Sequence, residues 1–235
     1  MAKTAYKRVI IKLSGEALAG QKGHGIDEKV LGDVVDQIVE VSKIGVQIGI
    51  VVGAGNFWRG RQGTEMDRTT ADHMGMLATV INALAIQDAL ERKGVPTRVQ
   101  TALTITRVAE PYILRKALSH LEHGRVVVFA CGTGNPYFTT DTAAALRAAE
   151  INADVLLLAK NVDGIYDSDP KTNPNAKKLD SVSYREYIEK NLKAMDTTAI
   201  TICMENSVPV LAFGLFEENA LMRTVMGEKI GTVIK

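Results

Sequence analysis

Short apolar runs alternate with longer amphipathic stretches along the whole chain of 235 residues. The apolar runs are rich in Val, Ile and Leu, as expected for strands of a sheet that helices cover on both faces. The predicted strands are Arg8–Leu13, Gln47–Val52, Arg98–Thr101, Arg125–Ala130, Val155–Ala159, Val208–Phe213 and Thr232–Ile234.

Between these runs, apolar residues recur at the spacing of three or four positions that is typical of helices. Regular alternation of the two kinds of element predicts an α/β fold, a three-layer α/β/α sandwich with a mainly parallel central sheet. The segment Asp163–Asp180 contains Asp-Gly, Asp-Pro and Asn-Pro dipeptides and predicts an irregular surface loop. The predicted helices are Asp27–Lys43, Thr70–Lys93, Glu110–Glu122, Asp141–Ile151, Tyr184–Asn191, Thr197–Asn206 and Asn219–Met226.

Composition narrows the class of protein. The formal net charge is only +1, which argues against a broad basic surface for DNA or RNA. No apolar segment is long enough to cross a bilayer, and the start of the chain does not resemble a secretory leader. The two cysteines, Cys131 and Cys203, form neither a metal-ligand spacing nor a disulfide framework. We therefore expect a cytoplasmic protein without a nucleic-acid partner, a membrane contact or a resident metal site.

The loop after the fourth predicted strand reads Gly-Thr-Gly-Asn-Pro-Tyr-Phe-Thr-Thr-Asp, from Gly132 to Asp141. It leads into an alanine-rich helix, whose free N–H groups and positive dipole end suit a phosphate. Tyr137 and Phe138 could hold a flat base beside that phosphate. The pattern predicts a phosphorylated ligand with a ring, most simply a nucleotide. Asp141 either caps the helix or orients cationic side chains around a transferring phosphoryl group.

Two further glycine turns follow predicted strands. Lys12 lies next to last in the first strand, just before Ser14 and Gly15. A Gly-Ala-Gly turn with a nearby Arg59 follows the second strand. Because the carboxyl ends of parallel strands share one edge, we expect Lys12, Arg59 and Asp141 to meet there. A lone Gly-x-Gly is a weak signal, and the third glycine and acidic ribose ligand of a dinucleotide fingerprint are missing. An ordinary P-loop motif is missing as well.

Two other stretches offer groups that could hold a nucleoside. Asp72 lies near the start of a long predicted helix, where it either caps the helix or accepts hydrogen bonds from ribose hydroxyls. The stretch after the fifth predicted strand includes Asn161, Tyr166 and Asp169. These residues could surround a base and its ribose, or the stretch could be a plain turn.

Several of these motifs together resemble the amino acid kinase superfamily. They are Lys12–Gly15, Gly53–Asn56, Gly132–Asp141 and Val162–Tyr166, and they occur in the expected order and at the expected separations. Within the superfamily, the sequence is similar to the bacterial uridylate kinases from about Tyr6 to the C-terminus. The segments that carry this closer likeness are Gly132–Asp141, Asp72–Thr79 and Val225–Lys229.

The resemblance implies transfer of the ATP γ-phosphoryl group to UMP in pyrimidine biosynthesis, with Mg²⁺ on the donor phosphates. It implies one domain over residues 1–235, with an acceptor-binding part near 1–152 and an ATP-binding part near 153–235. The implied catalytic residues are Lys12, Arg59 and Asp141. The implied ATP contacts are Lys12, Leu13, Ser14, Gly15, Gly55, Arg59, Asn161, Tyr166 and Asp169. The implied UMP contacts are Ala54, Asp72, Thr133, Gly134, Asn135, Pro136, Tyr137, Phe138, Thr139 and Thr140.

The same resemblance implies a homohexamer that GTP activates and UTP inhibits. The segment that matches the GTP-responsive loop consists of Gly20, Gln21, Lys22, Gly23, His24 and Gly25.

Two alternatives stay open at this point. One is a kinase of the same superfamily that acts on a carboxylate or carbamate, and the other is a nucleotide-binding storage or regulatory protein without turnover. Phosphoryl transfer to UMP agrees best with the residues. A nucleotide phosphate is already largely ionised near neutral pH, so the reaction needs aligned cations rather than a general base.

Overall fold

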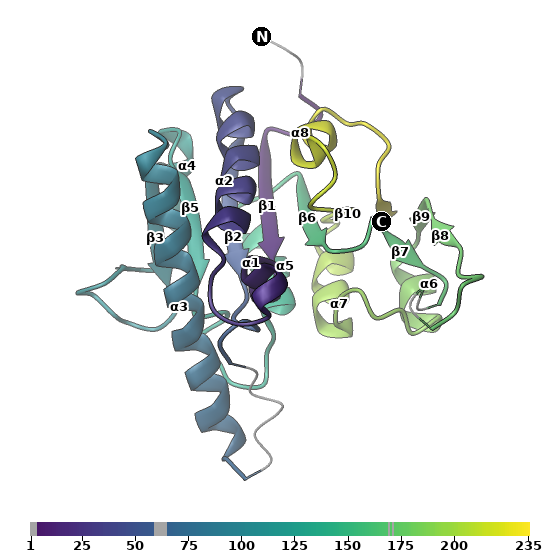
Figure 1. Cartoon of the computed structure of the whole chain (residues 1–235), viewed down its shortest axis with the longest axis horizontal. Helices are drawn as coiled ribbons and strands as arrows, with labels where there is room; N and C mark the ends of the chain where they lie inside the picture. The colour runs from purple at the N-terminus through teal and green to yellow at the C-terminus, as the bar shows by residue number, and fades with distance from the viewer. Residues whose placement is uncertain (1–3, 59–64, 169, 171) are drawn as a thin grey trace.

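The computed structural model describes residues 4–58, 65–168, 170 and 172–235. Over these residues, nine strands form one sheet (Figure 1). They are β1 (Arg8–Leu13), β2 (Gln47–Val52), β3 (Thr97–Thr101), β4 (Glu110–Pro111), β5 (Val126–Ala130), β6 (Val155–Lys160), β9 (Ser181–Val182), β10 (Val210–Gly214) and β11 (Thr232–Ile234). Their order across the sheet is β4-β3-β5-β2-β1-β6-β10-β11-β9.

Neighbouring strands run parallel, except that β10 and β11 are antiparallel. The central strand β1 pairs with β2 on one side and β6 on the other, so one continuous sheet crosses the soft division expected near Ala153. The carboxyl ends of β1, β2, β5, β6 and β10 consequently meet at one edge of the sheet, which we call the ligand edge.

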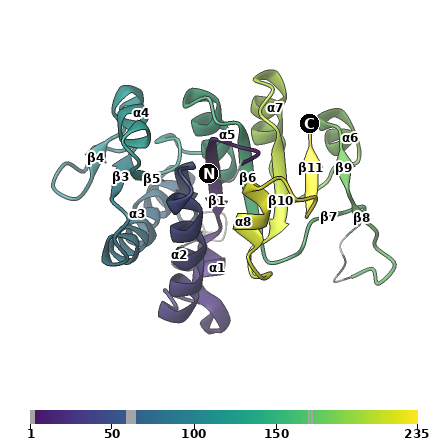
Figure 2. The ribbon, with the colours of Figure 1, turned by 90° about the horizontal axis from the view of Figure 1, so that it is seen from above.

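Helices cover both faces of the sheet, as Figure 2 shows. On β1, Val9, Ile11 and Leu13 belong to the core beneath one helix layer, and Ile10 belongs to the core beneath the other. This alternation is the two-residue period of a strand with both faces buried. One layer contains α1 (Gly15–Ala19), α2 (Glu28–Lys43), α3 (Arg68–Arg92) and α8 (Ala220–Val225). The other contains α4 (Leu114–Glu122), α5 (Thr140–Glu150), α6 (Tyr184–Glu189) and α7 (Thr197–Glu205). The predicted three-layer fold with a mainly parallel sheet is confirmed.

Two sequence predictions of local structure were wrong. The helix expected over Glu110–Glu122 begins only at Leu114, because Glu110 and Pro111 form β4 and pair with β3. Proline disfavours the helical conformation of the residue before it, and an edge strand tolerates proline. The loop expected over Asp163–Asp180 contains an antiparallel hairpin of β7 (Ile165–Tyr166) and β8 (Lys178–Leu179).

Within the described residues, no helix combines the length and the apolar character needed to cross a membrane.

Candidate active site

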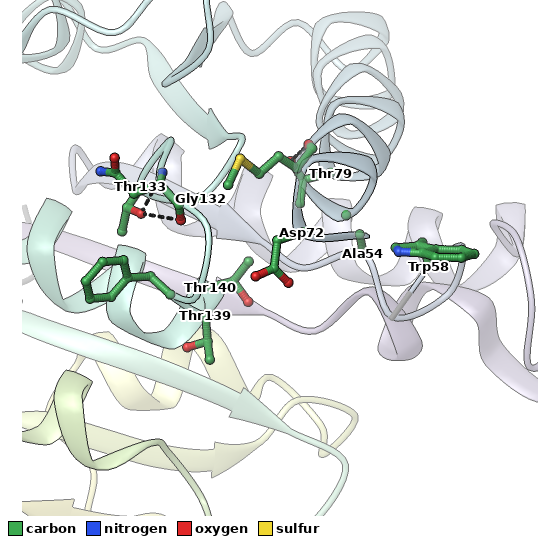
Figure 3. A pocket seen from close by; sticks show the side chains of 12 residues that line it. Ala54, Trp58, Asp72, Thr79, Gly132, Thr133, Thr139 and Thr140 are labelled. Atoms are coloured by element: carbon green, nitrogen blue, oxygen red, sulfur yellow. Dashed lines mark hydrogen bonds between the residues drawn. The ribbon is translucent and has the colours of Figure 1, made fainter. Parts of the chain in front are cut away.

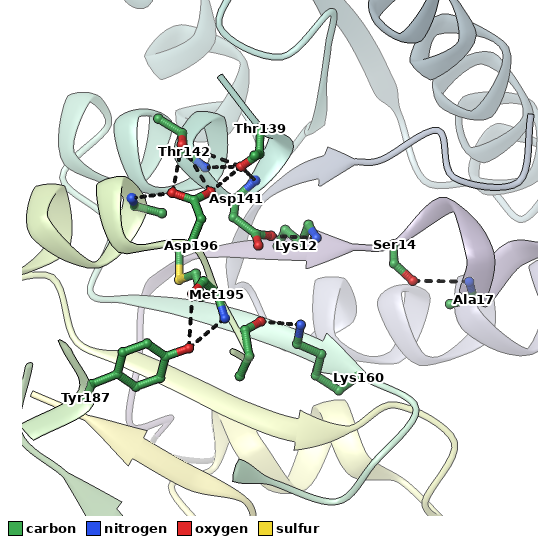
Figure 4. A network of polar contacts seen from close by, with 12 residues as sticks. Lys12, Ser14, Ala17, Thr139, Asp141, Thr142, Lys160, Tyr187, Met195 and Asp196 are labelled. Atoms are coloured by element: carbon green, nitrogen blue, oxygen red, sulfur yellow. Dashed lines mark hydrogen bonds and ion pairs between the residues drawn. The ribbon is translucent and has the colours of Figure 1, made fainter. Parts of the chain in front are cut away.

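A lysine and an aspartate form an ion pair at the ligand edge. Lys12, near the end of β1, is 8% exposed, and its Nζ lies 2.6 Å from Oδ1 of Asp141. Asp141 lies in the first turn of α5, after the N-cap residue Thr139 (Figure 4). The structure therefore brings together two of the three predicted catalytic residues. The third, Arg59, lies outside the described residues, as does the predicted ATP contact Asp169.

Asp141 Oδ1 is buried and receives no well-directed hydrogen bond, although Lys12 is close to it. The contact is thus an ion pair whose oxygen keeps a free lone-pair direction. A buried carboxylate oxygen of this kind can accept a further donor or a hard cation.

A second lysine, Lys160, lies at the same edge on the strand next to β1, and it was not assigned a role from the sequence. Lys160 ends β6, and its Nζ donates a hydrogen bond to the carbonyl oxygen of Ala194. Burial lowers the pKa of Lys160, the neighbouring Asp141 raises it, and the positive charge of Lys12 lowers it. Lys12, Asp141 and Lys160 therefore share one electrostatic environment. Lys160 could have been found by the same sequence signal that identified Lys12, namely a lysine near the carboxyl end of a buried parallel strand.

The glycine turns after β1 and β2 interlock at the ligand edge. A Cβ atom on Gly15 would lie 2.3 Å from Asn56 Oδ1 and 2.7 Å from the backbone nitrogen of Gly55. Only glycine fits at this position, so the two turns hold each other's backbone in place. Ser14 caps α1 by accepting a hydrogen bond from the Ala17 N–H, and the Leu13 side chain is buried in the core. Leu13 can consequently offer a ligand only its backbone.

Two buried side-chain amides, those of Asn56 and Asn82, hold the glycine turn after β2 in place. Asn56 and Asn82 exchange side-chain hydrogen bonds of 2.9 and 2.8 Å, and Asn82 also donates to the Gly53 carbonyl at 2.8 Å. Asn82 lies on α3 and was not found from the sequence, because its partner lies 26 positions away. The other Asn56 contact is with Gly25, at the end of the predicted GTP-responsive loop.

The loop between β5 and α5 has an unusual backbone. Cys131 and Tyr137 have φ angles of 63° and 74°, which side-chain-bearing residues rarely adopt. Distant residues impose this shape: Thr79 Oγ1 accepts from the Cys131 N–H at 2.7 Å, and Asp72 Oδ2 accepts from the Tyr137 N–H at 2.7 Å. Backbone strain that the surroundings enforce is concentrated at ligand sites in proteins.

The same loop forms one wall of a cavity of about 140 Å³, with the start of α3 and the turn after β2 opposite (Figure 3). Most of the predicted UMP contacts line this cavity, namely Ala54, Asp72, Thr133, Asn135, Phe138, Thr139 and Thr140. The lining residues that had no predicted role are Trp58, Gly75, Met76, Thr79 and Gly132. We call this space the acceptor cavity.

Three of the predicted UMP contacts do not line the acceptor cavity. Gly134 faces Ala102, and its φ of 82° explains the glycine. Pro136 lies between two lining stretches. The Tyr137 ring is 65% exposed, and the guanidinium of Arg68 lies 5.3 Å from the ring centroid. Arg68 also donates to Asp72 at 2.8 Å, so the ring and the carboxylate share one cation.

A second cavity of about 310 Å³ lies beyond the end of β6, and we call it the donor cavity. Tyr166 and the stretch Lys190–Ala194 line it, whereas the exposed Asn161 does not. The Tyr166 hydroxyl donates to Asp163 Oδ1 at 2.7 Å, and Lys178 donates to Oδ2 at 2.9 Å. These contacts lower the pKa of the Asp163 carboxyl against the opposing effect of burial. Asp163 therefore stays ionised beside the donor cavity.

Comparison with known proteins agrees with this geometry. Residues 7–213 match the model of the amino acid kinase family. A solved UMP kinase from Bacillus anthracis shares 39% identity, with 98% of this chain and 96% of that chain covered and a TM-score of 0.95. A UMP kinase from Ureaplasma parvum shares 39% identity over 97% of this chain and 98% of the other, with a TM-score of 0.91. A uridylate kinase from Archaeoglobus fulgidus is similar at 28% identity over 97% and 99% of the two chains, with a TM-score of 0.75.

Proposed function

The chain belongs to the amino acid kinase family, and we propose that it transfers the γ-phosphoryl group of ATP to UMP, giving ADP and UDP for pyrimidine nucleotide synthesis. The observation that carries the proposal is the cluster of Lys12, Asp141 and Lys160 at the ligand edge. It lies among loops that line the acceptor cavity on one side and the donor cavity on the other.

Threonine hydroxyl groups and two aromatic side chains, Trp58 and Phe138, line the acceptor cavity. Thr139 caps α5, so the positive end of the α5 dipole faces this wall of the cavity. These donors suit the phosphate of a nucleoside monophosphate, and Asp72 supplies the acceptor for a ribose hydroxyl. A carboxylate or carbamate acceptor would leave the Phe138 side of the cavity without a partner.

The reaction itself requires little covalent help from the protein. An ionised phosphate oxygen of UMP attacks the terminal phosphorus of ATP, and the bond from that phosphorus to the ADP oxygen breaks. No side chain has to remove a proton, since the second phosphate pKa is about 6. Lys12 and Lys160 stabilise the charge on the transferring group and the leaving oxygen, and Asp141 holds Lys12 in place.

The ligand edge also fits the magnesium that accompanies ATP. Mg²⁺ prefers hard oxygen ligands and takes most of them from phosphates and water, with one or two carboxylates. Asp141 is a carboxylate at this edge whose buried oxygen has a free lone-pair direction, so it would hold the ion directly or through water. When bound, the metal neutralises charge on the donor phosphates.

The experiment that tests this function is an ADP-release assay with ATP and magnesium, comparing UMP with CMP, dTMP, glutamate and carbamate. We expect fast turnover with UMP and much slower turnover with the other acceptors. Turnover with glutamate or carbamate but not UMP would assign another kinase activity. ATP binding without turnover on any acceptor would indicate a storage or regulatory role.

Several finer features belong to the same proposal. Residues 1–152 carry the acceptor cavity and residues 153–235 carry the donor cavity, within one domain and in the cytoplasm. Subunits associate as a homohexamer through surfaces that include the exposed apolar stripe of Met74, Leu77 and Ile81 on α3. GTP and UTP act as effectors, and the segment from 20 to 25 responds to GTP through the Gly25–Asn56 contacts. Light scattering and assays with added GTP or UTP test these features.

A further inference from the structure

The three residues before α7 contact both sides of the charged cluster (Figure 4). We propose that the segment Ala194–Asp196, held by Tyr187, is a positioning segment that fixes Lys160 relative to Asp141 during phosphoryl transfer. The inference rests on the proposed function and goes beyond it, because Met195, Asp196 and Tyr187 have no role in the site described above, and Ala194 appears there only as a partner of Lys160 and a lining residue of the donor cavity.

At one end, the segment holds Lys160. The Lys160 ammonium donates to the Ala194 carbonyl, which leaves the lysine with a fixed backbone partner. The next residue, Met195, is clamped by the fully buried Tyr187. Its N–H donates to the tyrosine oxygen at 2.7 Å, and its carbonyl accepts from the tyrosine hydroxyl at 3.1 Å. Burial raises the pKa of Tyr187 to about 12, so the hydroxyl keeps its proton and makes both bonds at neutral pH.

At the other end, Asp196 holds the start of α5. Its carboxylate accepts hydrogen bonds from the hydroxyls of Thr139 and Thr142, and it caps α7 by accepting from the Ala199 N–H at 2.9 Å. The Thr139 oxygen in turn accepts from the N–H groups of Asp141 and Thr142, at 3.1 and 3.2 Å. Asp196 thus orients the N-cap of the turn that carries Asp141.

The segment matters because its two partners come from different parts of the chain. Asp141 and Lys12 belong to the acceptor-binding part and Lys160 to the ATP-binding part, and Ala194 also lines the donor cavity. Charge stabilisation in phosphoryl transfer depends on the placement of cations to within a fraction of an ångström. A looser segment leaves both nucleotides able to bind while the cations are misplaced, so kcat should change more than either KM.

The first test compares two tyrosines of the same short helix. Tyr187→Phe removes the hydroxyl that clamps Met195, and Tyr184→Phe removes a hydroxyl that donates at 2.6 Å to Val208, away from the ligand edge. We expect Tyr187→Phe to lower kcat about tenfold, with both KM values within about twofold of the wild type. Tyr184→Phe should keep kcat within about twofold. Thermal unfolding of both variants corrects for any general loss of stability.

The second test uses Thr142, which is buried and has no predicted contact with either nucleotide. Thr142→Val removes its hydroxyl bonds to Asp196, whereas Thr142→Ser keeps the hydroxyl and should restore kcat. Asp196→Asn should lower kcat, and its effect should add only in part to that of Thr142→Val, because the two changes share the contact between Thr142 and Asp196. Asp27→Asn is the matched control, since Asp27 caps α2 in the same way, away from the charged cluster.

A readout independent of activity keeps the two proposals apart. In protein labelled with [¹³C]lysine, the Cε signal of Lys160, assigned by its loss in Lys160→Arg, reports the pKa of its ammonium. Tyr187→Phe should move that pKa toward the ordinary lysine value, because Lys160 becomes better hydrated, and Tyr184→Phe should not. Equal kcat and equal Lys160 titration in the two phenylalanine variants would overturn the positioning role. A wild-type protein inactive with UMP would overturn only the proposed function, and the titration would still decide on the segment.

Discussion

Two loops at the ligand edge are built in opposite ways. The loop between β5 and α5 is held by residues far away in the sequence, with contacts to Thr79, Asp72 and Asp196 that span 52, 65 and 57 positions. In the described part of the segment from 161 to 180, most side-chain contacts are short-range, and Thr232 of β11 ties the hairpin to the sheet through Ile165 and Leu179. Asp163 contacts Tyr166 and Lys178, and Asp167 pairs with Lys177, at separations of 3 to 15 positions.

The acceptor cavity is therefore held by side chains of two helices, α3 and α7, and it cannot change shape without disturbing one of them. The hairpin of β7 and β8 depends on its own short-range contacts and on one residue of the sheet, Thr232. We therefore expect changes at the acceptor wall to alter stability and UMP binding together. Changes at the donor wall should alter ATP binding alone.

The largest expected loss of activity comes from changing Lys12, which lies between the two cavities and which neither loop can replace. Lys12→Ala removes the cation paired with Asp141, and we expect kcat with UMP to fall by about 10²–10³. Circular dichroism and thermal unfolding should show that the fold persists. Wild-type turnover in this variant would remove Lys12 from the reaction.

A pH profile tests the second lysine of the cluster. The pKa of Lys160 is lowered, chiefly by burial, so it loses its proton at a lower pH than an ordinary lysine with a value of 10.5. The protonated form stabilises the phosphates, so kcat should fall about tenfold per pH unit above that lowered value. Lys160→Arg should remove this alkaline decline.

The stability contribution of Lys160 has the opposite sign. The unfolded chain holds this proton more tightly than the folded protein does, so raising the pH through the same window favours the folded state. Loss of activity that coincides with unfolding would therefore contradict the assignment. Denaturant unfolding at several alkaline pH values separates the two effects.

Thr79→Val tests the attachment of the acceptor wall to the core. It leaves the buried Cys131 N–H without its acceptor, and we expect a loss of about 1–3 kcal/mol in the free energy of unfolding. KM for UMP should rise about fivefold and KM for ATP should stay unchanged. Thr79→Ser keeps the hydroxyl and serves as the control. A rise in KM for ATP alone would reverse the comparison of the two walls.

The smallest effect should come from Tyr166→Phe at the donor wall. The change removes one bond to Asp163, which Lys178 still contacts. We expect KM for ATP to change by about twofold, with no measurable change in UMP binding or melting temperature. Steady-state kinetics with each nucleotide varied in turn provide the check. A marked loss of stability would show that this bond also supports the packing of Ile165 in the core.

The sequence predicted what depends on local pattern. β1, β2 and β11 match their predicted bounds residue for residue, because each is a short, mainly apolar run followed by a polar or glycine residue. Lys12 and Asp141 were paired correctly because each follows from the end of a parallel strand. The predicted start of α4 was too early, because the effect of Pro111 on the preceding residue outweighed the helical periodicity.

What the sequence did not reveal are contacts between distant residues. Asn82, Thr79 and Asp196 support the site through hydrogen bonds to backbone or side chains dozens of positions away. Each has an ordinary residue type for its element, such as a threonine within a helix. Only the packing of α3 and α7 against the sheet brings these groups to the loops they hold.

The buried thiol of Cys131, at the start of the loop between β5 and α5, can report how often that loop opens. Burial raises the pKa of Cys131, and its side chain is fully enclosed, so alkylating reagents can reach it only when the loop opens. Cys203, enclosed in α7 with its pKa raised by burial to about 12, reacts only when that helix detaches, and so serves as an internal reference. The ratio of the two alkylation rates therefore measures how often this loop opens in the intact protein. Bound nucleotide should slow alkylation of Cys131 without changing alkylation of Cys203.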